Sequence, residues 1–386
     1  MTPEISEAPA TISDPVNAAI LAVSEDRLAG FQTDPFGEIA SRTGIPVETV
    51  MQRIVTMLRA GTIRRVRQTL LSTSLAQGAL CAWEVAPERL DAAFDFMFRE
   101  DPFSGHVVIR TTDAVSAGSK YRLWTTLKVP QGYSLRKHAE WLRGAVGAQR
   151  YRLMPARMLF ALGVGHVRRR GLEPGARSQE RARPMQASVV ELSDLQWRVL
   201  VALKREFAPG EILRDVWSAR ARDAGLDVET FVNVARSLQE RRVIGRFSTF
   251  LEHVKPTAGN ERATRYNALF HWAVPAGREI DAGSEVARHY VITHAYWREG
   301  GPEFHGVNIM AVAHGMEKER VLAHKAAIDE HLREAGIGFS YTNVFWGGRS
   351  EIKPSEIAPD AYRSFCASRG IDPETMRTDP KEGASG

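Results

Sequence analysis

The stretch PVETVMQRIVTMLRAGTIRRVRQTL, residues 46–70, decides the fold, because a related stretch, DVETFVNVARSLQERRVIGRFSTFL, recurs at residues 227–251. The two stretches align without a gap: both carry Val-Glu-Thr near their start, and Leu70 falls on Leu251. Apolar residues at helical spacing fill the first half of each stretch, and a strand-like run follows. We infer that the chain is a tandem repeat.

Two shorter helices are expected before the long helix of each repeat. Pro15 and Pro35 fit the first turns of the two helices in the first repeat, and residues 210–222 supply one of those in the second. Three short helices followed by strands are the pattern of a winged helix-turn-helix. We therefore predict one such domain at residues 15–75 and another at residues 194–255.

An α/β pattern follows each helix-turn-helix. The expected order is β-α-β-β-α-β, a ferredoxin-like unit, at residues 76–166 and again at residues 262–357. One copy leaves a bare sheet face and open edges, so the two copies are expected to pair face to face within the chain. The predicted fold class is α+β.

The remaining segments are polar. Residues 1–14 are predicted to be a disordered lead-in, residues 167–193 an arginine-rich exposed linker, and residues 358–386 a tail whose last residues are disordered. The linker arginines are expected to be solvated, although a role in holding an anion or a partner remains open.

Composition predicts a soluble protein of a reducing compartment. The 386 residues carry a net charge of +5, which tolerates an anionic ligand or nucleic acid and proves neither. Cys81 and Cys366 form no disulfide framework or thiolate metal cluster. The start of the sequence does not fit a signal peptide, and no apolar run is long enough for a membrane span. The expected location is the cytoplasm.

Two histidine–arginine pairs stand out in the α/β units. His106 and Arg110 share one strand face by alternation, and His294, Tyr296 and Arg298 repeat that spacing 188 positions later (residue 106 against residue 294). A buried arginine needs an anion, and its fork geometry suits carboxylates. We expect the pairs to point into a shared cavity for a ligand with several carboxylates. Trp124 and Met310 are expected to belong to the core instead.

The long helices of the repeats leave DNA binding open. They offer outward basic and amide residues, as a recognition helix would. The two helices differ at these positions, which weakens that interpretation, and the alternative is a scaffold with solvated arginines. The residues concerned are Gln52, Arg53, Arg59, Asn233, Arg236, Gln239, Arg241 and Arg242.

At this point the sequence resembles the sirohaem decarboxylases, relatives of the leucine-responsive (Lrp/AsnC-type) regulators that act in the haem d1 and alternative haem pathways. The family's Ser-His-Cys-Tyr-x-Arg stretch is similar to residues 293–298, and its Tyr-Asn-Leu-x-x-Met-x-His-Gly stretch to residues 307–315. In the first half, residues 122–126 and 153–160 are similar to two further family stretches. The order agrees over about residues 15–355.

The resemblance implies a carboxy-lyase that removes two acetate carboxyl groups of sirohaem as carbon dioxide, giving didecarboxysirohaem. It implies His294 as proton donor or axial iron ligand, Tyr296 as an alternative acid, and His106 as the counterpart of His294. No cofactor is expected besides the substrate's own iron, and no metal site of the protein's own. Substrate binding is expected from Arg298, Arg110, Arg157, Tyr121, Asn308 and His314.

Two other functions stay open beside the decarboxylase. One is an Lrp/AsnC-type transcription regulator that responds to a ligand and binds DNA in a salt-dependent way. The other is a protein that binds a tetrapyrrole and leaves it unchanged. The two halves are expected to pair within the chain, and a homo-oligomer or a related subunit is an open partner.

Overall fold

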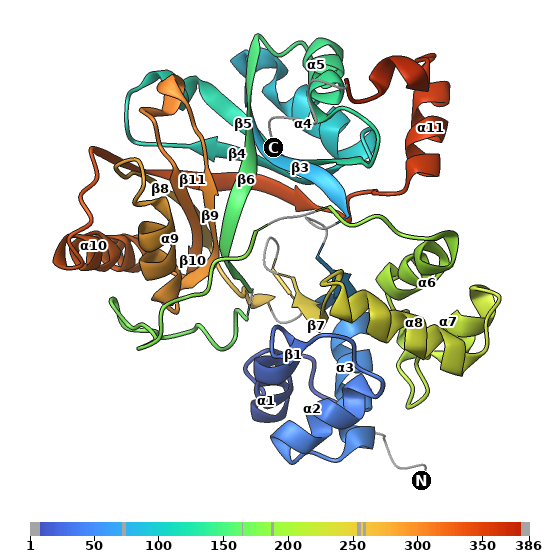
Figure 1. The fold of residues 1–386 in the computed structure, drawn as a ribbon. Helices are drawn as coiled ribbons and strands as arrows, with labels where there is room; N and C mark the ends of the chain where they lie inside the picture. The colour runs from blue at the N-terminus through green and yellow to red at the C-terminus, as the bar shows by residue number, and fades with distance from the viewer. Residues whose placement is uncertain are drawn as a thin grey trace. The chain divides into compact units, whose positions relative to one another are not determined.

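The computed structural model describes residues 8–71, 75–163, 165–186, 189–252, 256–257 and 260–379. They form two compact units, each built from both repeats of the chain (Figure 1). The first unit comprises residues 1–71, 163–171 and 190–265, and the second residues 72–162, 172–189 and 266–386. None of the described helices is long and apolar enough to cross a membrane.

The first unit contains the two repeated helical segments. Its elements are α1 (Pro15–Ser24), β1 (Leu28–Ala29), α2 (Pro35–Thr43), α3 (Val47–Arg59) and β2 (Ile63–Leu70), then α6 (Asp194–Lys204), the 3-10 turn η4 (Pro209–Glu211), α7 (Ser218–Asp223), α8 (Val228–Glu240) and β7 (Ile244–Leu251). The helix predicted over residues 210–222 is wrong in extent: only Ser218–Asp223 is α-helical, and Pro209–Glu211 forms a separate 3-10 turn.

The strands of the first unit pair between the repeats. β2 and β7 run antiparallel, with Val66 opposite Thr249, and the short β1 adds to the other edge of β7. Each repeat therefore satisfies its strand's backbone groups with the other repeat's strand, where a wing would use a hairpin of its own. The winged form of the helix-turn-helix stays a prediction.

The second unit contains both α/β segments. The first has β3 (Ala76–Glu84), η2 (Pro87–Arg89), α4 (Leu90–Arg99), β4 (Ser104–Thr111), η3 (Ala117–Lys120), β5 (Tyr121–Pro130), α5 (Leu135–Val146) and β6 (Arg150–Leu162). The second has β8 (Tyr266–Ala273), α9 (Glu279–Arg288), β9 (Ile292–Arg298), η6 (Pro302–Phe304), β10 (Ile309–Gly315), α10 (Lys318–Glu334) and β11 (Tyr341–Ile352). The predicted β-α-β-β-α-β order is present in both.

The eight long strands of the second unit close into one barrel, in the order β10-β8-β11-β4-β5-β3-β6-β9 (Figure 1). β11 pairs with β4, and β6 pairs with β9. Both edge strands of each half therefore pair with an edge strand of the other half. Face-to-face pairing of two separate sheets is therefore wrong. Closure gives every edge strand a partner and removes the open edges that a sandwich keeps.

Two apolar cores lie outside the barrel and one lies inside it. The helices α4, α5 and α11 (Pro359–Ser368) cover the first half, in a core that includes Trp83 of β3 and Phe94 of α4. The helices α9 and α10 cover the second half, in a core that includes Trp272 of β8 and Ile328 of α10. The inner core includes Trp124 and Met310, as predicted. Strands such as β4, β8 and β11 therefore have apolar residues on both faces, because both of their faces are buried.

The ends of the chain are more ordered than the sequence suggests. Residues 8–14 pack on α1: Ile12 is 1% exposed, and Asn17 donates to the carbonyl oxygens of Pro9 and Thr11. The lead-in is therefore not disordered over these residues, because its backbone carbonyls have partners. Residues 1–7 lie outside the described residues.

The predicted polar tail also needs correction. α11 and the turn η7 (Pro373–Met376) bury Tyr362, Phe365 and Met376 in the first outer core. The Tyr362 hydroxyl lies 3.0 Å from Nδ1 of His138, whose Nε2 lies 3.2 Å from the buried Asp101 carboxylate. Apolar side chains at helical spacing make this segment a packed helix. Residues 380–386 lie outside the described residues.

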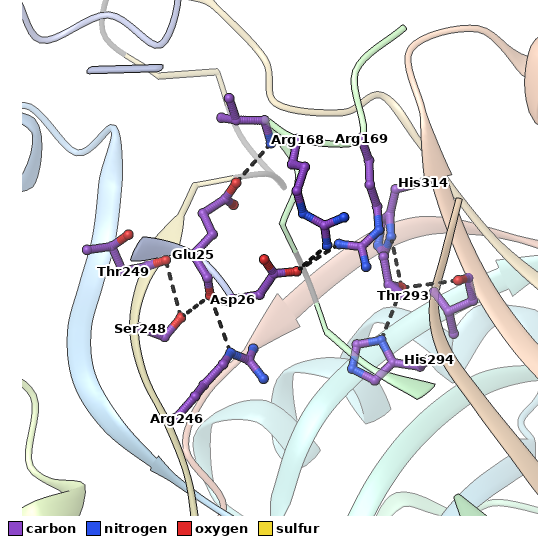
Figure 2. A network of polar contacts seen from close by, with 12 residues as sticks. Glu25, Asp26, Arg168, Arg169, Arg246, Ser248, Thr249, Thr293, His294 and His314 are labelled. Carbon is purple, nitrogen blue, oxygen red and sulfur yellow. Dashed lines mark hydrogen bonds and ion pairs between the residues drawn. The ribbon is translucent and has the colours of Figure 1, made fainter. Parts of the chain in front are cut away.

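The linker arginines are not simply solvated. Within the first unit, Arg168 and Arg169 lie 2.9 and 3.1 Å from the Asp26 carboxylate (Figure 2). Glu25 accepts a hydrogen bond from the Val167 backbone at 2.8 Å. In the second unit, Arg181 contacts Glu285 and Asp281. The exposed-linker prediction is wrong for Arg168 and Arg169, whose side chains are 28% and 13% exposed beside Asp26, whereas Arg181 is ion-paired but 56% exposed, as predicted.

Candidate functional site

Both predicted pairs face the inside of the barrel. Along β4, Val107 and Ile109 pack under the helices, so His106, Val108 and Arg110 point inward. Along β9, Ala295 and Trp297 pack outward, so Tyr296 and Arg298 point inward together with His294. The alternation read from the sequence therefore gives the correct face of both strands.

A chain of polar contacts joins His294 to the arginine of the other half. His294 Nδ1 lies 3.1 Å from Thr293 Oγ1, which lies 3.5 Å from His314 Nδ1 (Figure 2). His314 Nε2 lies 3.1 Å from Asn267 Nδ2, and Asn267 Oδ1 accepts from Arg110 at 3.1 Å. The sequence predicted pairs within a strand, whereas barrel closure connects strands from both halves.

The direction of these hydrogen bonds fixes proton positions. Thr293 donates its hydroxyl proton to the Val312 carbonyl, so its oxygen accepts from the histidines. His294 therefore carries a proton on Nδ1. The Asn267 amide donates to His314 Nε2, which leaves the proton of neutral His314 on Nδ1.

Two guanidinium groups are buried here without a carboxylate. Arg110 is 4% exposed and donates to Asn267 Oδ1 and the Phe345 carbonyl. Arg298 is 8% exposed, donates to the Met154 carbonyl and lies 4.3 Å from the Tyr296 ring centre. Burial lowers the pKa of Arg110 to about 10 and also lowers the pKa of Arg298. Among the described residues neither has an acidic partner, so both present uncompensated positive charge.

Tyr296 contacts both the His294 imidazole and the Arg298 guanidinium. Its ring stacks on that of His294 at a centroid distance of 6.3 Å and an interplanar angle of 15°. Burial raises the pKa of the Tyr296 phenol. The hydroxyl therefore stays protonated at neutral pH and can act as a hydrogen-bond donor or acid.

The other predicted site residues divide into two groups. His106 lies inside, with Nε2 2.8 Å from the Ser350 hydroxyl of β11. Tyr121 is buried against the Phe304 ring, at 5.3 Å between centroids, and burial raises the pKa of its phenol. His314 belongs to the polar chain described above. These three lie within the barrel, as a ligand site there requires.

Arg157 and Asn308 lie elsewhere. Arg157 is exposed on the outer face, over the Trp297 ring and 3.7 Å from the Glu299 carboxylate. Asn308 clamps the backbone of Val274 with both amide atoms, and it also donates to Glu279. Neither contacts the inner polar groups. Both assignments are wrong in geometry, because alternation turns one side chain outward and backbone groups use the other.

Aromatic side chains occupy the middle of the barrel between the two pairs. Phe304 is on the loop between β9 and β10, and its ring centroid lies 5.5 Å from that of Trp124 and 6.0 Å from that of Phe345. The expected open cavity is therefore filled at this point. Two described pockets, of about 600 and 360 Å³, lie elsewhere, one beside α11 and one lined by Arg136, Tyr151, Arg152 and Leu153.

Sequence reasoning missed three inward polar residues: Asn267 and His271 on β8, and Asn343 on β11. His271 is fully buried, and neither ring nitrogen has a hydrogen-bond partner. Burial, aided by the Arg110 charge, lowers the pKa of His271 to about 3. The parity of the predicted strand 266–274 puts Asn267 and His271 on one face, which was the signal available.

Among the described residues no cluster of acidic, histidine or cysteine side chains has metal-binding geometry.

Comparison with known proteins agrees with this architecture. The model of the AsnC-like ligand binding domain matches residues 75–160 and 264–341. The crystal structure of the siroheme decarboxylase NirDL is 18% identical, with a TM-score of 0.63 over 91% of this chain and 97% of that chain. The structure of NirDL in complex with an iron-uroporphyrin III analogue is also 18% identical, with a TM-score of 0.62 over 91% of this chain and 98% of that chain. No curated protein matches the sequence. Two segments of the chain, residues 75–160 and 264–341, are therefore similar to the AsnC-like ligand binding domain, and the chain shares the fold of the siroheme decarboxylase NirDL.

Proposed function

We propose that the protein decarboxylates acetate side chains of sirohaem, giving didecarboxysirohaem. The observation that carries the proposal is the pair of buried guanidiniums, Arg110 and Arg298, which have no carboxylate partner among the described residues. A substrate with several carboxylates supplies the missing charge. The fold shared with NirDL, which was solved with an iron-uroporphyrin III analogue, supports a tetrapyrrole as that substrate.

The reaction needs binding groups and one proton per event. Breaking the bond between the acetate methylene and the carboxyl carbon releases carbon dioxide and leaves an electron pair on the methylene. The conjugated macrocycle spreads that charge, and a proton converts the methylene to a methyl group. The protein's part is to hold the carboxylates and deliver the proton.

His294 and Tyr296 are the groups proposed to deliver it. His294 holds its Nδ1 proton toward Thr293, and its imidazole is the group proposed to transfer a proton to the substrate. Tyr296 keeps its proton because burial raises its pKa. Arg298 beside Tyr296 would hold a carboxylate close to that acid. His106 would play the corresponding part for the other half.

DNA binding finds less support in the contacts of the first unit. Arg53 pairs with Asp14 at 3.3 Å, Gln239 accepts from the Phe31 backbone, and Arg241 donates to Gln196. Three of the residues expected to read DNA are thus engaged within the protein. Engaged side chains must break these contacts before they can reach a base edge.

Anaerobic incubation with sirohaem tests the proposal. We expect mass spectrometry to show loss of one and then two carbon dioxide molecules. Binding of sirohaem without any mass loss would instead identify a non-catalytic tetrapyrrole-binding protein. Absence of binding, together with a salt-dependent shift of DNA mobility, would identify a regulator.

A further inference from the structure

Three side chains inside the barrel keep buried polar atoms that have no hydrogen-bond partner. They are His271 with both ring nitrogens, Arg110 with Nε and Asn343 with Nδ2. Such atoms are costly to bury, and most buried polar groups in proteins are paired. Three of them on one inner wall indicate a place prepared for another molecule.

The strand register brings these residues together. β8, β11 and β4 are neighbours in the barrel, and His271 lies directly opposite Asn343. Arg110 lies opposite Gly347 on β11 and donates to the Phe345 carbonyl. The Phe345 ring is 4.9 Å from that of His271, so these side chains share the inner face.

The unpartnered atoms of this wall are mainly donors. Asn343 accepts from the Thr112 hydroxyl and from the Val344 backbone through Oδ1, which leaves the NH₂ group facing away from both. Arg110 keeps an N–H and its positive charge, and a neutral His271 offers one N–H more. A carboxylate, with two acceptor oxygens and a negative charge, matches this set.

We propose that Arg110, His271 and Asn343 form an inner subsite for one carboxylate of the ligand, covered by Phe304. The subsite specifies part of the proposed function, since the carboxylate is that of a tetrapyrrole side chain. His271 and Asn343 act here as binding residues that orient this side chain.

Phe304 closes the subsite from the loop between β9 and β10. Its ring is 2% exposed and lies 6.1 Å from His271 and 5.3 Å from Tyr121. The loop has positive φ angles at Gly301, His305 and Gly306, of which the one at His305 is uncommon for a residue with a side chain. Because the loop supplies the cover, ligand entry requires Phe304 to move out.

The first test separates stability from affinity. His271→Leu removes two unpartnered nitrogens, so we expect the Tm of the free protein to rise by about 2–4 °C. We expect its affinity for iron uroporphyrin III to fall about tenfold. The control is His138→Leu, which removes an equally buried histidine with both nitrogens paired and should lower the Tm. Unchanged affinity in His271→Leu would overturn the subsite.

A second test does not depend on tetrapyrrole chemistry. Phe304→Ala leaves a ring-sized space beside His271, which a small aromatic molecule can fill. We expect phenylacetate to raise the Tm of this variant more than toluene does, and the double variant with His271→Leu to lose that difference. Equal effects of both compounds on Phe304→Ala would overturn the subsite. One result would separate the subsite from the proposed function. If wild-type protein does not bind iron uroporphyrin III, while phenylacetate still stabilises Phe304→Ala more than toluene does, the carboxylate subsite is supported and the proposed function is contradicted.

Discussion

At the residue scale, two arginines of the second unit show how position decides role. Arg298 is buried without an acidic partner, whereas Arg157 is exposed beside Glu299. We expect Arg298→Ala to weaken sirohaem binding about 10- to 100-fold with a smaller change in kcat, because it removes a charged hydrogen-bond donor. Absorbance titration measures the Kd. The matched Arg157→Ala variant should bind like wild type, and an equal loss in both would show that Arg298 holds no carboxylate.

His294 is expected to act on the chemical step. His294→Ala removes the proposed acid, so we expect kcat to fall about 100-fold or more, with a Kd within a few-fold of wild type. Tyr296→Phe, which keeps the ring and loses the hydroxyl, identifies the acid by comparison. Single-turnover rates measured by mass spectrometry separate the two. A wild-type rate in His294→Ala, with a large loss in Tyr296→Phe, would transfer the acid role to Tyr296.

At the element scale, the segment 165–171 is held by two carboxylates with opposite behaviour (Figure 2). Burial raises the pKa of Glu25 from 4.5 to about 8, although the Val167 backbone donates to it. Asp26 has its pKa lowered by the hydrogen bond and charge of Arg168, aided by Arg169, against the opposing effect of burial. Neighbouring carboxylates of α1's C-terminal turn thus differ in protonation at neutral pH.

This difference predicts a pH dependence of stability. Glu25 binds its proton more tightly when folded, so its contribution is complete below pH 4.5 and is lost as the pH rises to about 8. Glu25→Gln keeps an acceptor without the titration, and we expect its Tm to fall less than that of wild type between pH 5 and pH 8. Asp26→Asn, the control, should lower the Tm across this range. Parallel pH profiles of Glu25→Gln and wild type would contradict the assignment.

At the scale of the whole molecule, neither repeat completes a unit by itself. β2 pairs with β7 in the first unit, and β4 with β11 and β6 with β9 in the second. Each half alone would expose long strand edges and the inward arginines. Duplication within one chain therefore brings both halves together at a fixed ratio.

A split chain tests this dependence. We expect fragments separated after Gln186 to co-purify as a one-to-one complex when co-expressed, because each supplies the strand partners of the other. Expressed alone, each fragment should aggregate or self-associate. Size-exclusion chromatography with light scattering measures the result. Two well-folded monomeric halves would show that the barrel pairing is dispensable.

Local pattern predicted a large part of this molecule. The repeat, the β-α-β-β-α-β order and the inward face of His106, Arg110, His294 and Arg298 follow from periodicity, which neighbouring residues set. Roles of these residues remain predictions. Arg157 and Asn308, which were assigned from the family resemblance, were misassigned because a motif match does not show whether a carboxylate or a backbone group lies near the side chain.

The amino-acid order alone determined which side chains share a strand face, since alternation in a strand is a property of the backbone. Tertiary structure decided which strands meet: barrel closure links His294 of one half to Arg110 of the other through Thr293, His314 and Asn267. It also decided that His271 stays unpaired beneath Phe304. The link between Arg110 and Asn267 depends on the register of segments 157 positions apart, which no local pattern encodes. The cover over His271 depends on where the loop that carries Phe304 packs, which the pattern of neither segment shows.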